Sequence, residues 1–147
     1  MMAHLPILPI ALPMLLGALI LALGGRGDAL QRPLAVSGTT LQLLIACLLL
    51  ARADGGEYSV YLAGNWPAHL GIALLVDRTS ALMVLLTAGL GLVALLHACG
   101  GWDRRAPHFH ALFQFQLAGL SGAFLTADLF NLFVFFEVLL IASYGLM

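Results

Sequence analysis

Long apolar segments, separated by short polar connections, run along the whole chain. A helix of about 20 mostly apolar residues spans the hydrocarbon core of a bilayer, so each segment predicts a membrane-spanning helix. The predicted spans cover residues 5–23, 33–50, 79–96, 110–125 and 129–147. We therefore expect an all-α integral membrane protein whose single membrane domain, residues 1–147, contains about five helices.

The connection between the second and third spans has a different pattern. Glu57 to Ala63 alternates loosely with the period of a β-strand, and the turn sequence Gly64-Asn65-Trp66-Pro67 follows it. This pattern predicts a short β-hairpin, or an interfacial segment, lying across the ends of the second and third helices. A re-entrant segment buried between the helices is the alternative.

Composition and charge agree with a membrane protein. Of the residues, 62% are hydrophobic and 9% are charged, whereas soluble domains have about 25% charged residues. The mean hydropathy is +1.03. The connections after the first and third spans hold two arginines each, and the positive-inside rule therefore places them in the cytoplasm and the N-terminus outside. The second connection also holds two arginines, but acidic residues accompany them and it is longer.

One carboxylate, Glu137, lies in the middle of the fifth predicted span. It follows Asp128 by nine residues, a distance of about 13 Å along a helix, which is close to the bilayer midplane. A charge at that depth costs ~3 kcal/mol on insertion scales, and intramembrane ionisable residues usually mark ion pathways. Asp128 and Asn131 are polar residues at the start of the helix, and they point elsewhere on the helical wheel.

The helical wheel surrounds Glu137 with apolar side chains and one hydroxyl group. Four residues fall within about 40° of it, namely Phe130, Phe133, Ile141 and Tyr144. An apolar environment disfavours the charged form of a carboxyl group. We hypothesise that Glu137 carries a proton, with Tyr144 as its polar neighbour. The alternative is a structural glutamate that is hydrogen-bonded to another helix.

The fourth span carries a polar stripe formed by His110, Gln114 and Ser121. These residues stand at i, i+4 and i+11 and fall within about 40° of one another on the wheel. The stripe predicts either a hydrated path along which protons reach the interior or interhelical hydrogen bonds. Small residues on the same helix, Gly119 and Gly122 among them, favour close packing against a neighbouring helix.

Two histidines, His108 and His110, stand close together, but without further ligands they make a poor metal site. We expect them to belong to an interfacial loop in which Asp103 pairs with Arg104 or Arg105. No metal site is predicted.

The two cysteines form no redox or ligand motif. The sequence also has no phosphate-binding loop and no haem or iron–sulfur spacing. We therefore expect no cofactor, no nucleic-acid partner and no enzymatic activity.

Two stretches of the chain resemble the D subunit of bacterial Mrp-type antiporters. They are Gly101-Trp-Asp-Arg-Arg-Ala-Pro-His-Phe-His-Ala-Leu-Phe-Gln-Phe-Gln-Leu117 and Gly122-Ala-Phe-Leu-Thr-Ala-Asp-Leu-Phe-Asn-Leu-Phe-Val-Phe-Phe-Glu-Val-Leu-Leu-Ile-Ala-Ser-Tyr-Gly-Leu146. The resemblance implies a subunit of a multisubunit Na⁺/H⁺ or K⁺/H⁺ antiporter in the bacterial inner membrane, related to the antiporter-like subunits of respiratory complex I. By that resemblance Glu137 matches a fifth-helix glutamate that moves protons. The resemblance also implies partner lysines on later helices, beyond Met147.

Family members of this kind are much longer, and the last span here has no polar flank. We therefore expect the chain to be the N-terminal part of a larger helical bundle whose partners are the other antiporter subunits, the transported ions and the lipid bilayer. A proton-pumping subunit of an NADH:quinone oxidoreductase or a membrane hydrogenase is the first alternative. A structural membrane scaffold is the second.

Overall fold

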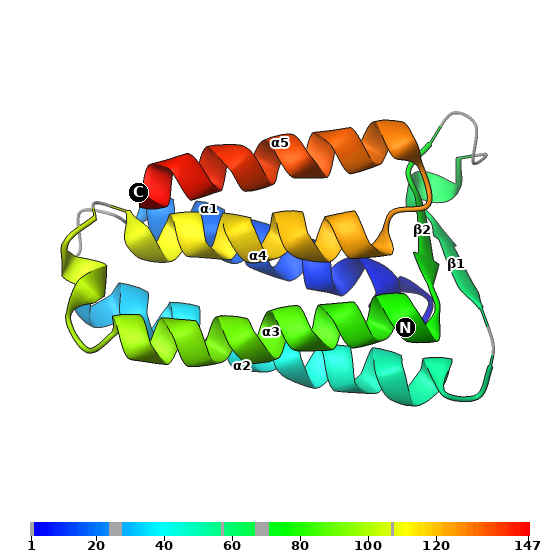
Figure 1. Cartoon of the computed structure of the whole chain (residues 1–147), viewed down its shortest axis with the longest axis horizontal. Coiled ribbons are helices and arrows are strands. Elements are labelled where there is room, and N and C mark those ends of the chain that lie inside the picture. Colours follow the sequence, from blue (N-terminus) through cyan, green and yellow to red (C-terminus); the bar gives the residue numbers. More distant parts are fainter. Residues whose placement is uncertain (1, 24–27, 57, 67–70, 107) are drawn as a thin grey trace.

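The computed structural model describes residues 2–23, 28–56, 58–66, 71–106 and 108–147. In these residues five long α-helices lie side by side along one axis (Figure 1). They are α1 (Leu8–Ala22), α2 (Asp28–Ala53), α3 (Arg78–Ala98), α4 (Phe109–Leu125) and α5 (Leu129–Leu146). A short 3₁₀ helix, η1 (Met2–Ile7), leads into α1, and another, η3 (Trp102–Arg104), precedes α4.

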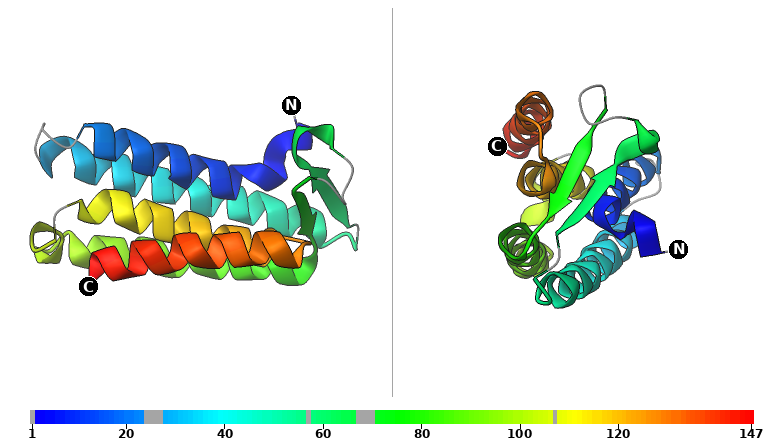
Figure 2. Two further views of the ribbon diagram at one scale, coloured as in Figure 1. Left: turned by 90° about the horizontal axis from the view of Figure 1, so that it is seen from above. Right: turned by 90° about the vertical axis from the view of Figure 1, so that its right-hand side faces the viewer.

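Four helical segments are long and apolar enough to cross a membrane. They are His4–Ala22, Leu30–Ala53, Arg78–Ala98 and Leu129–Leu146. The remaining helix, α4, has 17 residues and lies alongside them (Figures 1 and 2). The predicted fold class, an α-helical membrane bundle with about five spans and a small sheet, is confirmed.

The second helix is longer than the predicted span 33–50. The prediction began the span at Pro33, whereas Pro33 lies inside the helix. A proline removes a hydrogen bond to the carbonyl four residues earlier, and here that carbonyl belongs to the first turn of α2. The return between the first two spans was predicted over residues 24–32. Residues 24–27 of it, including Arg26, lie outside the described part of the chain, as do Glu57 and Pro67 of the second connection.

Aspartate side chains fix the starts of two helices. Asp77 accepts a hydrogen bond from the backbone N–H of Ser80, and the Ser80 hydroxyl accepts one from the backbone N–H of Asp77, which forms a capping box at α3. Asp128 accepts from the N–H groups of Phe130 and Asn131 at α5. These bonds satisfy donors that a helix start otherwise leaves unpaired.

A two-stranded antiparallel sheet closes one end of the bundle (Figures 1 and 2). Strands β1 (Ser59–Leu62) and β2 (Ala73–Val76) pair with Ser59 opposite Val76. The N–H of Ala127 donates to the carbonyl of Ala73 at 2.9 Å, so that the sheet also holds the connection between α4 and α5. The hairpin alternative is therefore the correct one for this connection.

Helix α4 packs against several neighbours, and its contact with α5 is close. Gly119 and Gly122 lie against α5, where a Cβ added at Gly119 would approach the backbone nitrogen of Leu139 to 3.1 Å. Helix α1 and helix α3 also pack on α4. Because α5 contacts the bundle mainly through α4, its outer side stays free of the other described helices.

Candidate functional site

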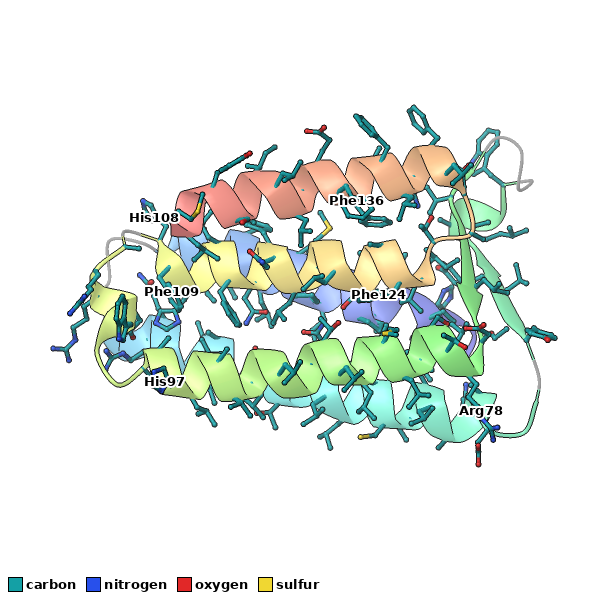
Figure 3. The ribbon with its side chains drawn as sticks, in the orientation of Figure 1. Arg78, His97, His108, Phe109, Phe124 and Phe136 are labelled. Atoms are coloured by element: carbon teal, nitrogen blue, oxygen red, sulfur yellow. The ribbon has the colours of Figure 1, made fainter. Side chains whose placement is uncertain are left out.

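Glu137 is exposed on the outer side of α5. The side chains predicted to share its face are exposed as well, with fractions of 76% for Phe130, 62% for Phe133, 68% for Ile141 and 67% for Tyr144. Figure 3 shows side chains projecting from α5 away from the bundle. The helical wheel therefore grouped these residues correctly.

The described residues do not bury Glu137. Of the α5 residues, Asn131 and Ala142 are the buried ones, because the helix lies at the edge of the bundle and packs mainly against α4. The apolar surroundings of Glu137 in this structure are its neighbours on its own helix. Further shielding has to come from lipid or from protein outside the described residues.

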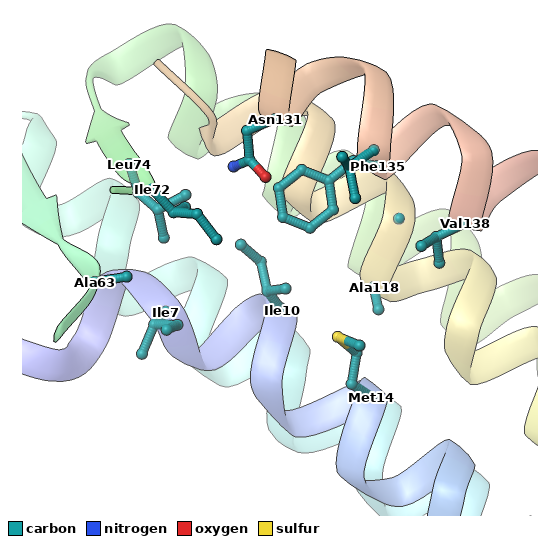
Figure 4. A pocket seen from close by; sticks show the side chains of 12 residues that line it. Ile7, Ile10, Met14, Ala63, Ile72, Leu74, Ala118, Asn131, Phe135 and Val138 are labelled. Atoms are coloured by element: carbon teal, nitrogen blue, oxygen red, sulfur yellow. The ribbon is translucent and has the colours of Figure 1, made fainter. Parts of the chain in front are cut away.

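Asp128 and Asn131 have structural partners at the start of α5. The Asp128 carboxylate caps the helix, and the Asn131 side-chain amide donates to the Thr126 hydroxyl at 3.1 Å. Asn131 also borders an apolar cavity of about 250 Å³ between α1, α4, α5 and the sheet (Figure 4). The cavity lining is otherwise apolar, with Ile10, Met14 and Phe135 among its residues, so it offers no path for a charge.

A buried ion cluster lies at the opposite end of the bundle from the sheet. The Arg32 guanidinium donates to both carboxylate oxygens of Asp103 at 2.6 and 2.8 Å, and Nε2 of His110 lies 3.1 Å from Asp103 Oδ2. The side chains of Asp103 and His110 are 1% and 4% exposed. The hydrogen bond from Arg32 holds the pKa of Asp103 below its usual value, against the opposing effect of burial.

This cluster corrects the expected pairing of Asp103 with Arg104 or Arg105. Arg32 comes from α2, 71 residues earlier in the sequence, and reaches Asp103 because the starts of α2 and α4 are neighbours in space. Arg105 stacks on the Trp102 ring at 4.2 Å instead.

Two further polar layers continue from the ion cluster along the contact between α2 and α4. The Gln114 amide nitrogen donates to the Ala35 carbonyl at 3.1 Å and to the Thr39 hydroxyl at 3.0 Å. One layer further on, the Gln42 amide nitrogen donates to the Ser121 hydroxyl at 3.0 Å. We call the three layers the α2–α4 seam; its side chains are Arg32, Thr39, Gln42, Asp103, His110, Gln114 and Ser121.

Gln42 has a second partner that the sequence explains. Its amide nitrogen also donates to the Pro9 carbonyl at 3.2 Å. Pro13 has no N–H with which to bond that carbonyl within α1. Gln42 therefore satisfies an acceptor that the proline leaves open.

The predicted stripe of His110, Gln114 and Ser121 lies on one buried face, but that face points towards α2. Glu137 and Tyr144 lie on the outer side of α5, so the structure does not bring the stripe and the glutamate together. Sequence reasoning missed the α2 half of the seam. Its signal was present, because Thr39 and Gln42 are polar positions three residues apart inside an apolar span.

No group of three or more His, Cys, Asp or Glu side chains in the described residues could hold a metal ion. His108 is exposed, with a backbone φ of 62°, and it is not part of the ion cluster. Burial, followed by the nearby charge of Asp103, raises the pKa of the Cys99 thiol.

The chain is similar in sequence to the D subunits of two antiporters. No family model matches the chain. It is 46% identical to the D subunit of a probable K(+)/H(+) antiporter of Rhizobium meliloti, over 98% of this chain and 28% of that protein. It is 40% identical to the D subunit of a Na(+)/H(+) antiporter of Alkalihalophilus pseudofirmus, over 97% of this chain and 29% of that protein. The chain thus spans less than a third of the length of these relatives.

Two solved structures have the same fold. The structure of the Mrp complex from a Dietzia species matches with a TM-score of 0.91 and 31% identity, over 97% of this chain and 26% of that chain. The membrane-bound sulfane sulfur reductase, an archaeal respiratory membrane complex, matches with a TM-score of 0.87 and 31% identity, over 95% of this chain and 29% of that chain.

Helices of membrane-crossing length around a buried polar seam define a multi-pass membrane protein. More specifically, the chain is a homologue, over nearly its whole length, of the N-terminal portion of the D subunit of monovalent cation/proton antiporters. The predicted resemblance is confirmed, and these relatives are transporter subunits rather than enzymes.

Proposed function

We propose that the chain is part of a subunit of a multisubunit Na⁺/H⁺ or K⁺/H⁺ antiporter, in which Glu137 carries the proton. The observation that supports this role most directly is the place of Glu137, a carboxylate in the middle of an apolar face of a membrane-crossing helix. Such a group is costly to retain and marks an ion pathway. The names of the two relatives differ in the cation, K⁺ in one and Na⁺ in the other.

The proposed chemistry follows from the setting of the carboxyl group. A charged carboxylate inside a bilayer requires a nearby cation or another polar partner. We propose that a cationic side chain elsewhere in the full-length protein supplies it, and that Tyr144 offers a hydroxyl group on the same face. The membrane potential supplies ~2.3 kcal/mol per charge per 100 mV.

The partners and the location belong to the same proposal. We propose that the protein assembles with the other antiporter subunits in the bacterial inner membrane, with its N-terminus outside. Arg104 and Arg105 of the third connection support this orientation.

A second candidate is a proton-translocating subunit of a redox-driven membrane complex. The match to the archaeal respiratory complex favours it. The two functions differ in their energy source, since an antiporter exchanges ions without a reductant.

The test is cation-induced dissipation of ΔpH in everted vesicles that contain the full-length protein and its partner subunits. We expect Glu137→Gln to abolish exchange and Glu137→Asp to retain part of it, with unchanged assembly. Asp54→Asn is the matched control, because it makes the same chemical change at an exposed carboxylate outside the membrane that pairs with Arg78. Full exchange in Glu137→Gln would refute the carrier role, and exchange that needs a reductant would favour the second candidate.

A further inference from the structure

The connection between α3 and α4 presents an exposed positive charge at one end of the bundle. Arg105 is exposed, and its guanidinium lies 4.2 Å from the centre of the Trp102 ring. Within the part of the chain that the structure describes, Arg105 forms no ion pair. The nearby carboxylate of Asp103 is 1% exposed and is bound to Arg32 and His110 instead. The charge of Arg105 is therefore open to an anion from outside these residues.

This connection lies at the level where a bilayer meets water. It follows the end of α3, a helix of membrane-crossing length, and precedes the start of α4. Trp102 is 60% exposed, and tryptophan is enriched at the headgroup level of membranes. Arg104 and Arg105 follow it along the chain, and both are exposed. Because a guanidinium donates two parallel hydrogen bonds to a phosphate group, the connection presents the groups that suit a phospholipid headgroup.

An apolar groove between α3 and α4 leads to the same connection. Its volume is about 440 Å³, and Leu90, Ala94 and Phe113 are among the residues that line it. The connection spans the end of the groove, because it joins the two helices that form the walls. Two polar residues also line the groove: the Thr87 hydroxyl donates to a carbonyl of its own helix, and the Oε1 of Gln116 is buried. The groove therefore suits an acyl chain whose headgroup lies at the connection.

We propose that this connection and this groove bind one anionic phospholipid. Its phosphate group accepts hydrogen bonds from the Arg105 guanidinium, Arg104 adds a second positive charge, and one acyl chain lies in the groove beside Leu90. Stacking on Trp102 holds the guanidinium in place, so little side-chain freedom is lost on binding. Basic residues at the membrane surface favour anionic headgroups over zwitterionic ones. Such binding requires the membrane location of the chain but not the transport role proposed for Glu137.

Fluorescence quenching by brominated lipids tests the binding in the full-length protein, with native cysteines replaced and the protein reconstituted in phosphatidylcholine vesicles. Val93 is 66% exposed on α3, beside the groove, and a fluorophore on Val93→Cys reports the lipid there. Leu15 is 71% exposed on α1, and a fluorophore on Leu15→Cys is the matched control for bulk lipid. We expect brominated phosphatidylglycerol to quench the first at least about fivefold more effectively than brominated phosphatidylcholine. The two lipids should quench the second equally.

Arginine variants test the headgroup contact in the same assay. Arg105→Gln should lower the preference for phosphatidylglycerol about fivefold, whereas Arg78→Gln should keep it, because Arg78 lies at the sheet end and is paired with Asp54. An unchanged preference in Arg105→Gln would overturn the site, as would equal quenching by both lipids at Val93→Cys. Quenching by neither lipid would overturn it too, because protein would then cover the groove. Loss of the preference in inorganic phosphate, but not in chloride of the same ionic strength, would replace the lipid by a soluble anion.

Discussion

Asp103 connects three parts of the chain that are distant in sequence. It lies in η3, between α3 and α4, and it binds Arg32 of α2 and His110 of α4. A buried carboxylate is stable only when cations and donors surround it, and here a bidentate guanidinium provides them. The cluster therefore fixes how α2 and α4 meet at the end of the bundle opposite the sheet.

Removing this charge should destabilise the protein. We expect Asp103→Asn to lower the free energy of unfolding by about 3 kcal/mol, because it takes from a largely buried arginine the anion that it binds in two places. The measurement is thermal unfolding of the purified full-length protein in detergent. Asp54→Asn, which breaks an exposed ion pair with Arg78, should change stability by less than about 1 kcal/mol.

Lowering the pH should weaken the stabilisation that the Asp103 carboxylate provides. The pKa of Asp103 is lowered in the folded protein, so the stabilisation that it provides is complete above the ordinary carboxyl pKa of about 3.9. It is lost as the pH falls through the lowered folded value. The melting temperature of the wild type should therefore fall in this acidic range more than that of Asp103→Asn. Parallel curves for the two proteins would contradict the expectation.

At the scale of the helices, the sequence predicted faces but not neighbours. The spacing of His110, Gln114 and Ser121 predicted a polar face of α4, and Gly119 and Gly122 predicted a close-packing face. Periodicity reports only which side chains share a side of a helix. That the first face meets α2 and the second meets α5 depends on how the chain folds back, as does the pairing of Arg32 with Asp103.

The close contact between α4 and α5 gives a prediction with a matched control. A Cβ at Gly119 would lie 3.1 to 3.3 Å from backbone atoms of α5, whereas at Gly89 the nearest atom is a Leu43 methyl at 3.9 Å. We expect Gly119→Ala to destabilise the protein by about 1–3 kcal/mol, because a helix backbone cannot move aside as a side chain can. Gly89→Ala should be neutral or stabilising, since it removes the conformational freedom of glycine. Thermal unfolding of both variants measures the difference, and equal effects would contradict it.

In the whole molecule, many large apolar side chains lie on the outer surface, and several polar side chains lie in the interior beside the apolar core. Large apolar side chains such as Leu15, Leu90 and Phe130 are 71%, 69% and 76% exposed, whereas Gln42, Gln114 and Ser121 are fully buried. Lipid suits the first group, and hydrogen bonds between helices satisfy most of the second. Composition predicted the apolar exterior. The exposed position of Glu137 was not predictable, because the wheel does not say whether a face meets protein or lies at the edge.

The arrangement of the two ends predicts the orientation of the protein in the membrane. The sheet and η3 lie at opposite ends of the bundle (Figure 1), so they should face opposite sides of the bilayer. Arg104 and Arg105 lie at the η3 end, and the positive-inside rule places that end in the cytoplasm. Arg78, at the sheet end, is paired with Asp54.

A membrane-impermeant thiol reagent checks this orientation in the full-length protein without native cysteines. Tyr58 and Trp102 are suitable positions, because they are 77% and 60% exposed and lie near the sheet and in η3, respectively. We expect Tyr58→Cys to be labelled in right-side-out vesicles and Trp102→Cys in everted ones. The reverse pattern would place the N-terminus in the cytoplasm. Labelling of both from one side would contradict a bundle that spans the membrane, because the two positions would then share one surface.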